Sequence, residues 1–253
     1  MRIFHIGNCG YSYFRPSDYF GEGWKGKFKS VLQAYASKFS CVEINSSFYR
    51  IPKVETAERW REEAREVNKN FVFTVKAFQG ITHVHRFGGK SVQEFEVMKQ
   101  VCEALHAPIL VFQSPASFSP SKINIERLHH FFTNIKRGKL LLAWEPRGKW
   151  WGNDEVVEKT CKELDVINVV DPLRNQPQYF GRGVAYFRLH GFGWPSMYGY
   201  SFSKDELNKV KETCIQLAEK KKVKEFWVMF NNSACYENAL EFSSLLRNHF
   251  KSA

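Results

Sequence analysis

The sequence predicts an α/β protein built as one TIM-like (β/α)8 barrel domain over residues 1–253. Short apolar runs that end in charged or amide residues recur along the chain, and amphipathic segments of helical period separate most of them. Such an alternation of strand and helix favours a parallel sheet with helices packed outside it. The length of 253 residues also suits one barrel, which typically needs about 250.

Eight apolar runs are the predicted strands, and eight strands close a barrel. They lie near residues 3–7, 41–45, 71–76, 109–113, 140–145, 166–171, 185–190 and 225–230. Most of these runs end on a charged or amide residue. The C-terminal ends of the strands carry the active site in barrels of this kind, so the pattern predicts where the site lies.

Seven outer helices are expected, at about residues 28–39, 54–66, 92–105, 124–134, 154–163, 204–221 and 236–249. Ser91 with Glu94, and Ser203 with Glu206, have the spacing of capping boxes, which predicts two helix starts. The link of residues 172–183, between the sixth and seventh strands, contains two prolines and two glycines without helical periodicity. We therefore expect the outer helix after the sixth strand to be missing.

The composition indicates a basic protein. The formal net charge is +11 and the isoelectric point is about 9.3, which favours nucleic acid or another anionic partner. The six cysteines show no close pairing, so a reducing, cytoplasmic setting is expected. No apolar run approaches the roughly 18 residues that would span a bilayer, so we expect no membrane anchor.

Charged and amide side chains cluster at the predicted strand ends: Glu43, Asn45, Lys76, Gln113, Glu145, Asp171, Arg188, His190 and Asn231. Because side chains alternate along a strand, we expect these to point together into the barrel mouth. One interpretation is purely structural, with Glu43 or Glu145 paired to Arg188 or Lys76 to hold the mouth together. A structural layer would normally be Val, Ile and Leu, so chemistry is the favoured interpretation.

The cations Arg50, Lys76, Arg147 and Arg188 favour a phosphate ligand, since guanidinium groups match phosphate oxygens bidentately. Arg50 and Arg147 are also open to a simpler role, in which they only join neighbouring loops. In the catalytic interpretation, Glu145 is a general base or metal ligand that Asp171 and Glu43 support, and His190 is the candidate acid.

A divalent metal is a further hypothesis for the barrel mouth. Its candidate ligands are Glu43, Glu145, Asp171 and His190. No spacing motif supports such a site, so the cofactor stays unknown.

Aromatic residues are frequent in the predicted loops around the mouth. Such rings stack on nucleic-acid bases or on sugar faces, although about half of them are expected only to pack loops onto the barrel. The candidate substrate contacts are Tyr11, Tyr49, Trp150, Trp194 and the amide Asn232. Trp150, Trp194 and Tyr198 are the rings we expect to be exposed.

Several motifs occur in order along the chain: Gly7-Asn8-Cys9-Gly10-Tyr11-Ser12-Tyr13, Val42-Glu43-Ile44-Asn45-Ser46-Ser47-Phe48-Tyr49-Arg50, Lys76 with Ile81-Thr82-His83, Phe112-Gln113-Ser114-Pro115 with Ser117-Phe118, Glu145-Pro146-Arg147 with Trp150, Tyr186-Phe187-Arg188-Leu189-His190-Gly191, and Phe230-Asn231-Asn232. In these motifs the chain resembles the YecE-like family, a domain of unknown function numbered 72. The resemblance implies a β/α barrel but no established activity.

At the level of fold, the family resembles the barrel group of apurinic endonucleases and xylose-isomerase-like sugar enzymes. Ser233 departs from the family pattern, which usually has Asp after the two asparagines. If that Asp is essential in relatives, activity is weakened here.

Three hypotheses about function follow. The leading one is an enzyme acting on a phosphate-containing substrate, most plausibly a nucleic-acid phosphodiesterase or endonuclease-like hydrolase. Its partner would be single-stranded or duplex nucleic acid, or else a small phosphorylated molecule. The second is a sugar or sugar-phosphate isomerase, epimerase or glycosidase that uses Glu43 and Glu145 as paired carboxylates. The third is a non-catalytic nucleic-acid-binding protein.

Overall fold

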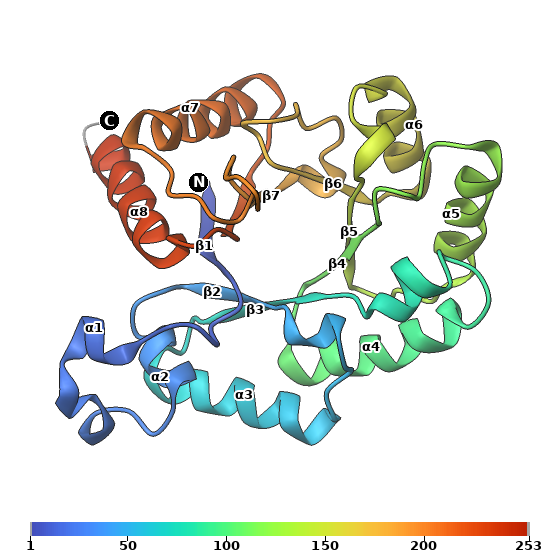
Figure 1. Cartoon of the computed structure of the whole chain (residues 1–253). Coiled ribbons are helices and arrows are strands. Elements are labelled where there is room, and N and C mark those ends of the chain that lie inside the picture. The colour runs from blue at the N-terminus through green and yellow to red at the C-terminus, as the bar shows by residue number, and fades with distance from the viewer. Residues whose placement is uncertain (1, 252–253) are drawn as a thin grey trace.

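The computed structural model describes the backbone of residues 2–251 and the side chains of residues 2–247. Eight parallel strands pair in chain order and β8 pairs with β1, so they form a closed barrel (Figure 1). The strands are β1 (Ile3–Cys9), β2 (Cys41–Ile44), β3 (Val72–Lys76), β4 (Ile109–Gln113), β5 (Leu141–Glu145), β6 (Ile167–Val170), β7 (Val184–Leu189) and β8 (Glu225–Phe230). The predicted fold is confirmed.

Seven α-helices of the described residues surround the barrel (Figure 1). They are α2 (Val31–Ala36), α3 (Val54–Val67), α4 (Ser91–Leu105), α5 (Lys122–Asn134), α6 (Asp154–Leu164), α7 (Lys204–Lys220) and α8 (Cys235–Lys251). A short helix that the sequence did not predict, α1 (Pro16–Phe20), lies in the loop between β1 and α2. In the part of the chain that the structure describes, none of these helices is long and apolar enough to cross a membrane.

The link between β6 and β7 contains no α-helix, as predicted from its prolines and glycines. Its only helical piece is a 3-10 turn, η5 (Gly181–Gly183). The segment is held against β6 instead, because Asn168 Oδ1 accepts the backbone N–H of Gln178 at 2.9 Å and the Asn168 N–H donates to the Tyr179 carbonyl at 3.3 Å.

The two predicted capping boxes have different outcomes. Ser203 caps α7 as expected, because its hydroxyl accepts the N–H of Glu206 and the Glu206 carboxylate accepts the N–H of Ser203. The prediction of a capping box at Ser91 is wrong. The helix α4 begins at Ser91 itself, and the Ser91 hydroxyl donates to the Ile81 carbonyl at 3.3 Å. Glu94 lies 3.4 Å from His85 instead.

Alternation along the strands separates two apolar layers. Residues such as Val111, Val169 and Met229 fill the inside of the barrel, and their neighbours in sequence, such as Phe112 and Val170, belong to the larger core beneath the helices. Every second residue of a strand faces the inside of the barrel, and at the strand ends these inward-facing residues are polar.

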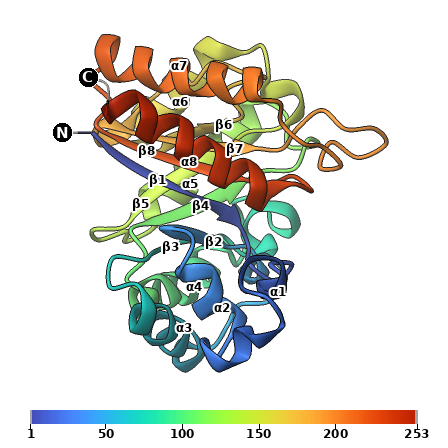
Figure 2. The same ribbon diagram turned by 90° about the vertical axis from the view of Figure 1, so that its left-hand side faces the viewer.

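The strand ends that carry these polar residues lie opposite the chain termini. In Figure 2 the two termini lie on one side of the barrel, and the loop between β7 and α7 projects from the other side. Each strand runs from the first side toward the second, since all pairings are parallel. The mouth of the barrel is therefore the side with the long loops.

Candidate functional site at the barrel mouth

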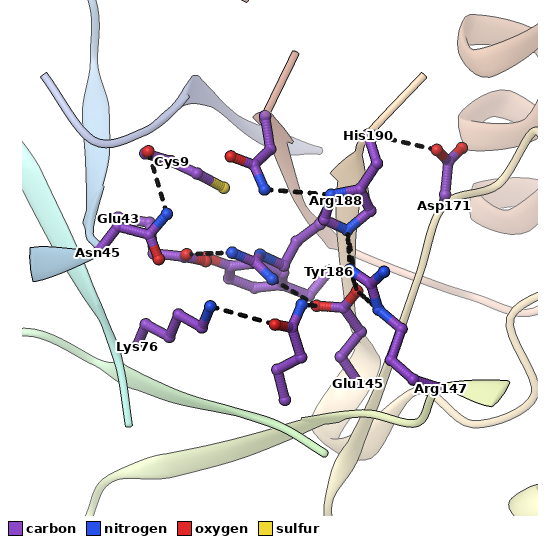
Figure 3. A network of polar contacts seen from close by, with 12 residues as sticks. Cys9, Glu43, Asn45, Lys76, Glu145, Arg147, Asp171, Tyr186, Arg188 and His190 are labelled. Atoms are coloured by element: carbon purple, nitrogen blue, oxygen red, sulfur yellow. Dashed lines mark hydrogen bonds and ion pairs between the residues drawn. The ribbon is translucent and has the colours of Figure 1, made fainter. Parts of the chain in front are cut away.

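Arg188, at the end of β7, joins the carboxylates of two other strands (Figure 3). Its Nη2 lies 2.8 Å from Glu43 Oε1 on β2, and its Nη1 lies 2.5 Å from Glu145 Oε2 on β5. Deeper in the barrel, the Tyr186 hydroxyl donates to Glu43 Oε2 at 2.9 Å and contacts the Thr74 hydroxyl at 2.8 Å. An unpaired ion at such a buried place would cost several kcal/mol, so these pairs hold the ends of β2, β5 and β7 together.

The Glu145 carboxylate accepts hydrogen bonds from three residues besides Arg188. Arg147 Nε and Nη2 lie 2.8 Å and 2.6 Å from Oε1, His190 Nε2 lies 2.9 Å from the same oxygen, and Gln113 Nε2 donates to Oε2 at 2.9 Å. Burial alone would raise the pKa of Glu145, but the nearby charges of Arg147 and Arg188 and the hydrogen bond with His190 outweigh it and hold the pKa well below its usual value. Glu145 is therefore ionised at neutral pH and is a weak base.

His190 lies between Glu145 and the amide of Asn231. Asn231 Nδ2 lies 3.1 Å from His190 Nδ1, and His190 Nε2 lies 2.9 Å from Glu145 Oε1 and 2.8 Å from Arg147 Nη2. Burial lowers the pKa of His190 to about 4, although the negative charge of Glu145 acts in the opposite direction. At pH 7 His190 is neutral.

Lys76, at the end of β3, is the cation in this group that lacks a carboxylate partner. Its Nζ donates to Gln113 Oε1 at 3.1 Å and lies 4.0 Å from the centroid of the Phe48 ring. Among the described side chains, no Asp or Glu forms an ion pair with it, in contrast to Arg147 and Arg188. Burial lowers the pKa of Lys76 to about 8, and the charge of Arg188 acts in the same direction.

We call the residues joined by these contacts the mouth network: Glu43, Lys76, Gln113, Glu145, Arg147, Tyr186, Arg188, His190 and Asn231. The predicted gathering of these polar side chains from separate strands is what the structure shows. The predicted structural salt bridge is also present at Arg188, whereas Lys76 takes no part in it.

Cys9 lies beside the mouth network and was not among the predicted site residues. It is the register partner of Glu43, and Asn45 Nδ2 donates to its carbonyl at 3.2 Å. Burial raises the pKa of the Cys9 thiol well above its usual value, although the charge of Arg188 acts in the opposite direction. The strand predicted here ended at residue 7, two residues too early. Extending it would have placed Cys9 among the inward-facing strand ends.

Two predicted site residues bind backbone groups instead of facing the network with their carboxylate or amide. Asp171 accepts the backbone N–H of His190 at 3.0 Å and a second backbone N–H at 3.1 Å. Burial raises the pKa of Asp171, while these N–H donors act in the opposite direction. Asn232 Nδ2 donates to the Tyr200 carbonyl and to Asn238 Oδ1. Asp171 therefore positions His190, and Asn232 fixes the loop after β8.

Burial excludes some of the predicted ligand contacts. Arg188 and Glu43 are 0% exposed, so neither reaches a ligand in this conformation, and a direct phosphate contact by Arg188 does not fit. The expectation that Trp150 is an exposed ring is wrong. Trp150 is 1% exposed, its Nε1 donates to the Phe118 carbonyl, and its ring packs edge-on against Trp144.

Other predicted contacts lie outside the network. Arg50 is exposed after the 3-10 turn η2 (Ser46–Phe48), and Trp194 is 93% exposed on the loop between β7 and α7. Trp194 and Tyr198 are exposed as predicted. Among the described side chains, neither Arg50 nor Trp194 hydrogen-bonds to the mouth network.

The predicted metal ligands do not form a metal site. Within residues 2–247, no three His, Cys, Asp or Glu side chains gather closely enough to hold a metal ion. Both carboxylate oxygens of Glu43, of Glu145 and of Asp171 already accept hydrogen bonds from protein donors. A divalent cation would have to displace them, so these residues do not fit a resident metal.

Two hollows adjoin the mouth network. One, of about 30 Å³, is lined by Glu145, Arg147, Asp171 and His190 among others and has room for little more than water. The other, of about 840 Å³, lies between the loops that follow β1, β2, β7 and β8. We call it the tyrosine cavity, because Tyr11, Tyr13, Tyr19, Tyr49, Tyr198 and Tyr236 line it together with Cys9, Asn45, Asn231, Asn232 and Ser233.

Comparisons with known proteins agree on the fold and the family. The family model "Protein of unknown function DUF72" matches residues 5–253. The UPF0759 protein YunF of Bacillus subtilis (strain 168) is 28% identical in an alignment over 236 residues, with a coverage of 80% for each chain. A crystal structure of a DUF72 family protein from Thermotoga maritima covers 97% of this chain with 99% of its own, at 24% identity and a TM-score of 0.74.

A more distant likeness concerns the fold alone. The crystal structure of endonuclease IV from Thermus thermophilus covers 100% of both chains at 11% identity, with a TM-score of 0.52.

Proposed function

The chain belongs to the DUF72 family, and we propose that it is an enzyme acting on a phosphate ester bound at the mouth network, with the phosphodiester of nucleic acid as the preferred substrate class. The proposal names a binding group and a reaction class for a family whose activity is not established. Three features support this function: the charges of the mouth network, the basic net charge of the chain, and the fold shared with endonuclease IV.

The observation that carries the proposal is the surplus positive charge of the mouth network. Glu43 and Glu145 face three cations, Lys76, Arg147 and Arg188. The two arginines are paired to the carboxylates, and Lys76 holds only an amide oxygen and an aromatic face. A buried ammonium group without a counter-ion is stabilised by an incoming anion. A phosphate oxygen at Lys76 would supply that charge.

The polar groups of the mouth that keep some exposure would then have separate roles. Lys76 and the half-buried Arg147 would contact the non-bridging phosphate oxygens and stabilise the charge that develops on them. The amides of Asn45, Gln113 and Asn231, which are all half-buried, would orient the ester. Arg188 would act through Glu145, as a positioning residue below the ligand.

Lys76 is also the best candidate for moving a proton. Its pKa of about 8 lies near a working pH, where a group can both give and take a proton. Glu145, predicted as a general base, is poorly suited to that role because its pKa is held low. The same low pKa weakens the glycosidase alternative, which needs a carboxylic acid with a raised pKa.

The test is cleavage of end-labelled single-stranded and duplex DNA and RNA, with and without EDTA, by the wild type and by Lys76→Met. Lys122→Met is the matched control, since it removes the same charge from a side chain that is 90% exposed on α5. We expect the wild type and Lys122→Met to cut and Lys76→Met to lose at least tenfold in rate.

Salt-sensitive binding without cutting by any variant would favour the non-catalytic nucleic-acid-binding protein. Absence of both binding and cutting would overturn the preference for nucleic acid and leave the small sugar phosphates as substrates. Equal cleavage rates for Lys76→Met and the wild type would show that Lys76 has no role in the reaction.

A further inference from the structure

The tyrosine cavity opens beside the mouth network and shares Asn231 with it. Asn231 lines the cavity while its Nδ2 lies 3.1 Å from His190 Nδ1, and Cys9 lines it while it pairs in register with Glu43. Asn45 lines it as well, and its Nδ2 is engaged with the Cys9 carbonyl. The cavity meets the proposed phosphate site at Asn45 and Asn231, the amides that would orient the ester, whereas Lys76 and Arg147 lie outside its lining. A group attached to the phosphate on the side of these amides would extend into the cavity.

The cavity has the size of a small-molecule site. Its volume of about 840 Å³ falls within the range of about 300 to 1,000 Å³ that is typical for bound small molecules. Six tyrosines line it, which supply flat apolar faces and hydroxyl groups together. Tyr49 is 73% exposed and Tyr198 is 42% exposed, so both rings have free faces.

Two amide oxygens beside the cavity are buried and lack a hydrogen-bond partner among the described residues. Asn232 is 6% exposed, and its Nδ2 is committed to the Tyr200 carbonyl and Asn238. Asn232 Oδ1 and Asn45 Oδ1 are buried, and neither has a hydrogen-bond partner among the described residues. Because both oxygens are closed to solvent, a ligand in this conformation meets the exposed tyrosines of the lining instead: Tyr13 is 90% exposed and Tyr49 is 73% exposed.

From these features we propose that the tyrosine cavity binds a ring bearing hydroxyl groups, a pentose or hexose, that is attached to the phosphate held at the mouth network. Hydroxyl groups of the ring would hydrogen-bond with exposed tyrosine hydroxyls such as that of Tyr13, and the face of the ring would stack on Tyr49. The inference rests on the proposed function, because it takes the phosphate site as the anchor. Its ring can come from a nucleotide or from a sugar phosphate.

Isothermal calorimetry with three probes separates the two proposals. The probes are inorganic phosphate, ribose 5-phosphate and adenosine 5′-monophosphate, each titrated into the full chain. We expect both ring-bearing probes to bind at least tenfold more tightly than inorganic phosphate. If adenosine 5′-monophosphate binds more tightly than ribose 5-phosphate, the source is a nucleotide; equal affinities indicate a sugar phosphate.

Two variants test whether the ring of the ligand binds in the tyrosine cavity. Tyr49→Ala removes an exposed ring and should weaken the ring-bearing probes about fivefold or more, as loss of one stacking face does. Ser46→Trp should block the cavity from an exposed position on its lining. Both should bind inorganic phosphate like the wild type. Ile123→Ala, which removes a 64% exposed apolar side chain on α5 outside the cavity lining, is the control and should change nothing.

Two failures are distinguishable. Equal affinities for all three probes, with no effect of Tyr49→Ala or Ser46→Trp, would overturn the ring site and leave the phosphate site in place. Failure of inorganic phosphate and of both ring-bearing probes to bind would overturn the proposed function and the ring site together.

Discussion

The pairing around Glu145 predicts a large cost for replacing its carboxylate by an amide of the same shape. Glu145→Gln would leave Arg147 without a counter-ion and Arg188 with Glu43 alone, in a place where Arg188 is 0% exposed. Removing one partner of a buried ion pair costs about 3 to 5 kcal/mol. For a chain of this size, each kcal/mol shifts Tm by about 2 to 4 °C, so the melting temperature should fall by about 6 to 20 °C.

Urea unfolding at pH 7, followed by tryptophan fluorescence, measures this cost directly. Glu126→Gln is the matched control, since that carboxylate is 62% exposed and lies 4.0 Å from Lys122. It should change the unfolding free energy by no more than about 0.5 kcal/mol. A Glu145→Gln protein with the urea midpoint of the wild type would refute the assignment of Glu145 as the counter-ion of the mouth network.

The same variant has a pH signature. Because the pKa of Glu145 is lower in the folded protein than in the unfolded chain, the stability it contributes is present above the unfolded pKa of about 4.3. That contribution is lost as pH falls from there toward the folded pKa. The difference in unfolding free energy between the wild type and Glu145→Gln should therefore narrow below about pH 4, and a constant difference would contradict the argument.

Three more predictions concern single residues of the mouth. Lys76→Met should be at least as stable as the wild type at pH 7. The wild type should then gain up to about 3 kcal/mol relative to it as pH rises from about 8 to 10, because the folded pKa of about 8 lies below the unfolded value; urea unfolding at several pH values tests this. The imidazole of His190, with its pKa lowered to about 4, should show no titration by NMR between pH 8 and 5, and His190→Gln should lack the loss of stability that the wild type shows from about pH 6.5 toward 4. Trp150→Phe should cost about 1 to 3 kcal/mol in urea unfolding, since it leaves the buried Phe118 carbonyl without the indole donor, and an unchanged midpoint would speak against that bond.

The roles proposed for the mouth network depend on the depth of each side chain as well as on its charge. Arg188 is paired to two carboxylates and is 0% exposed, whereas Lys76 is 9% exposed and the Arg147 side chain is 13% exposed. A variant of Arg188 should therefore affect stability and positioning before it affects ligand contact. Variants of Lys76 should affect ligand contact before they affect stability.

The sequence alone predicted the barrel and the place where its charged side chains gather. Apolar runs separated by helical segments predicted eight strands, and the period of two along each strand predicted that Glu43, Glu145 and Arg188 face inward. The C-terminal ends of parallel strands converge on one side of a closed barrel. Local pattern was therefore enough to predict that these groups meet, and the irregular link after β6 was predicted from its prolines and glycines in the same way.

Only the tertiary structure decided which group contacts which, and which side chains reach solvent. Arg188 bonds to Glu43 and Glu145, which lie 145 and 43 residues away in the chain, and no local pattern distinguishes this pairing from one with Lys76. Trp150 and Tyr49 both follow strands, yet one is 1% and the other 73% exposed, because packing against Trp144 buries the first. Which side chains pair and which are buried depends on rotamers and on contacts between segments that are distant in the chain. The local sequence pattern does not specify either, so only the tertiary structure shows them.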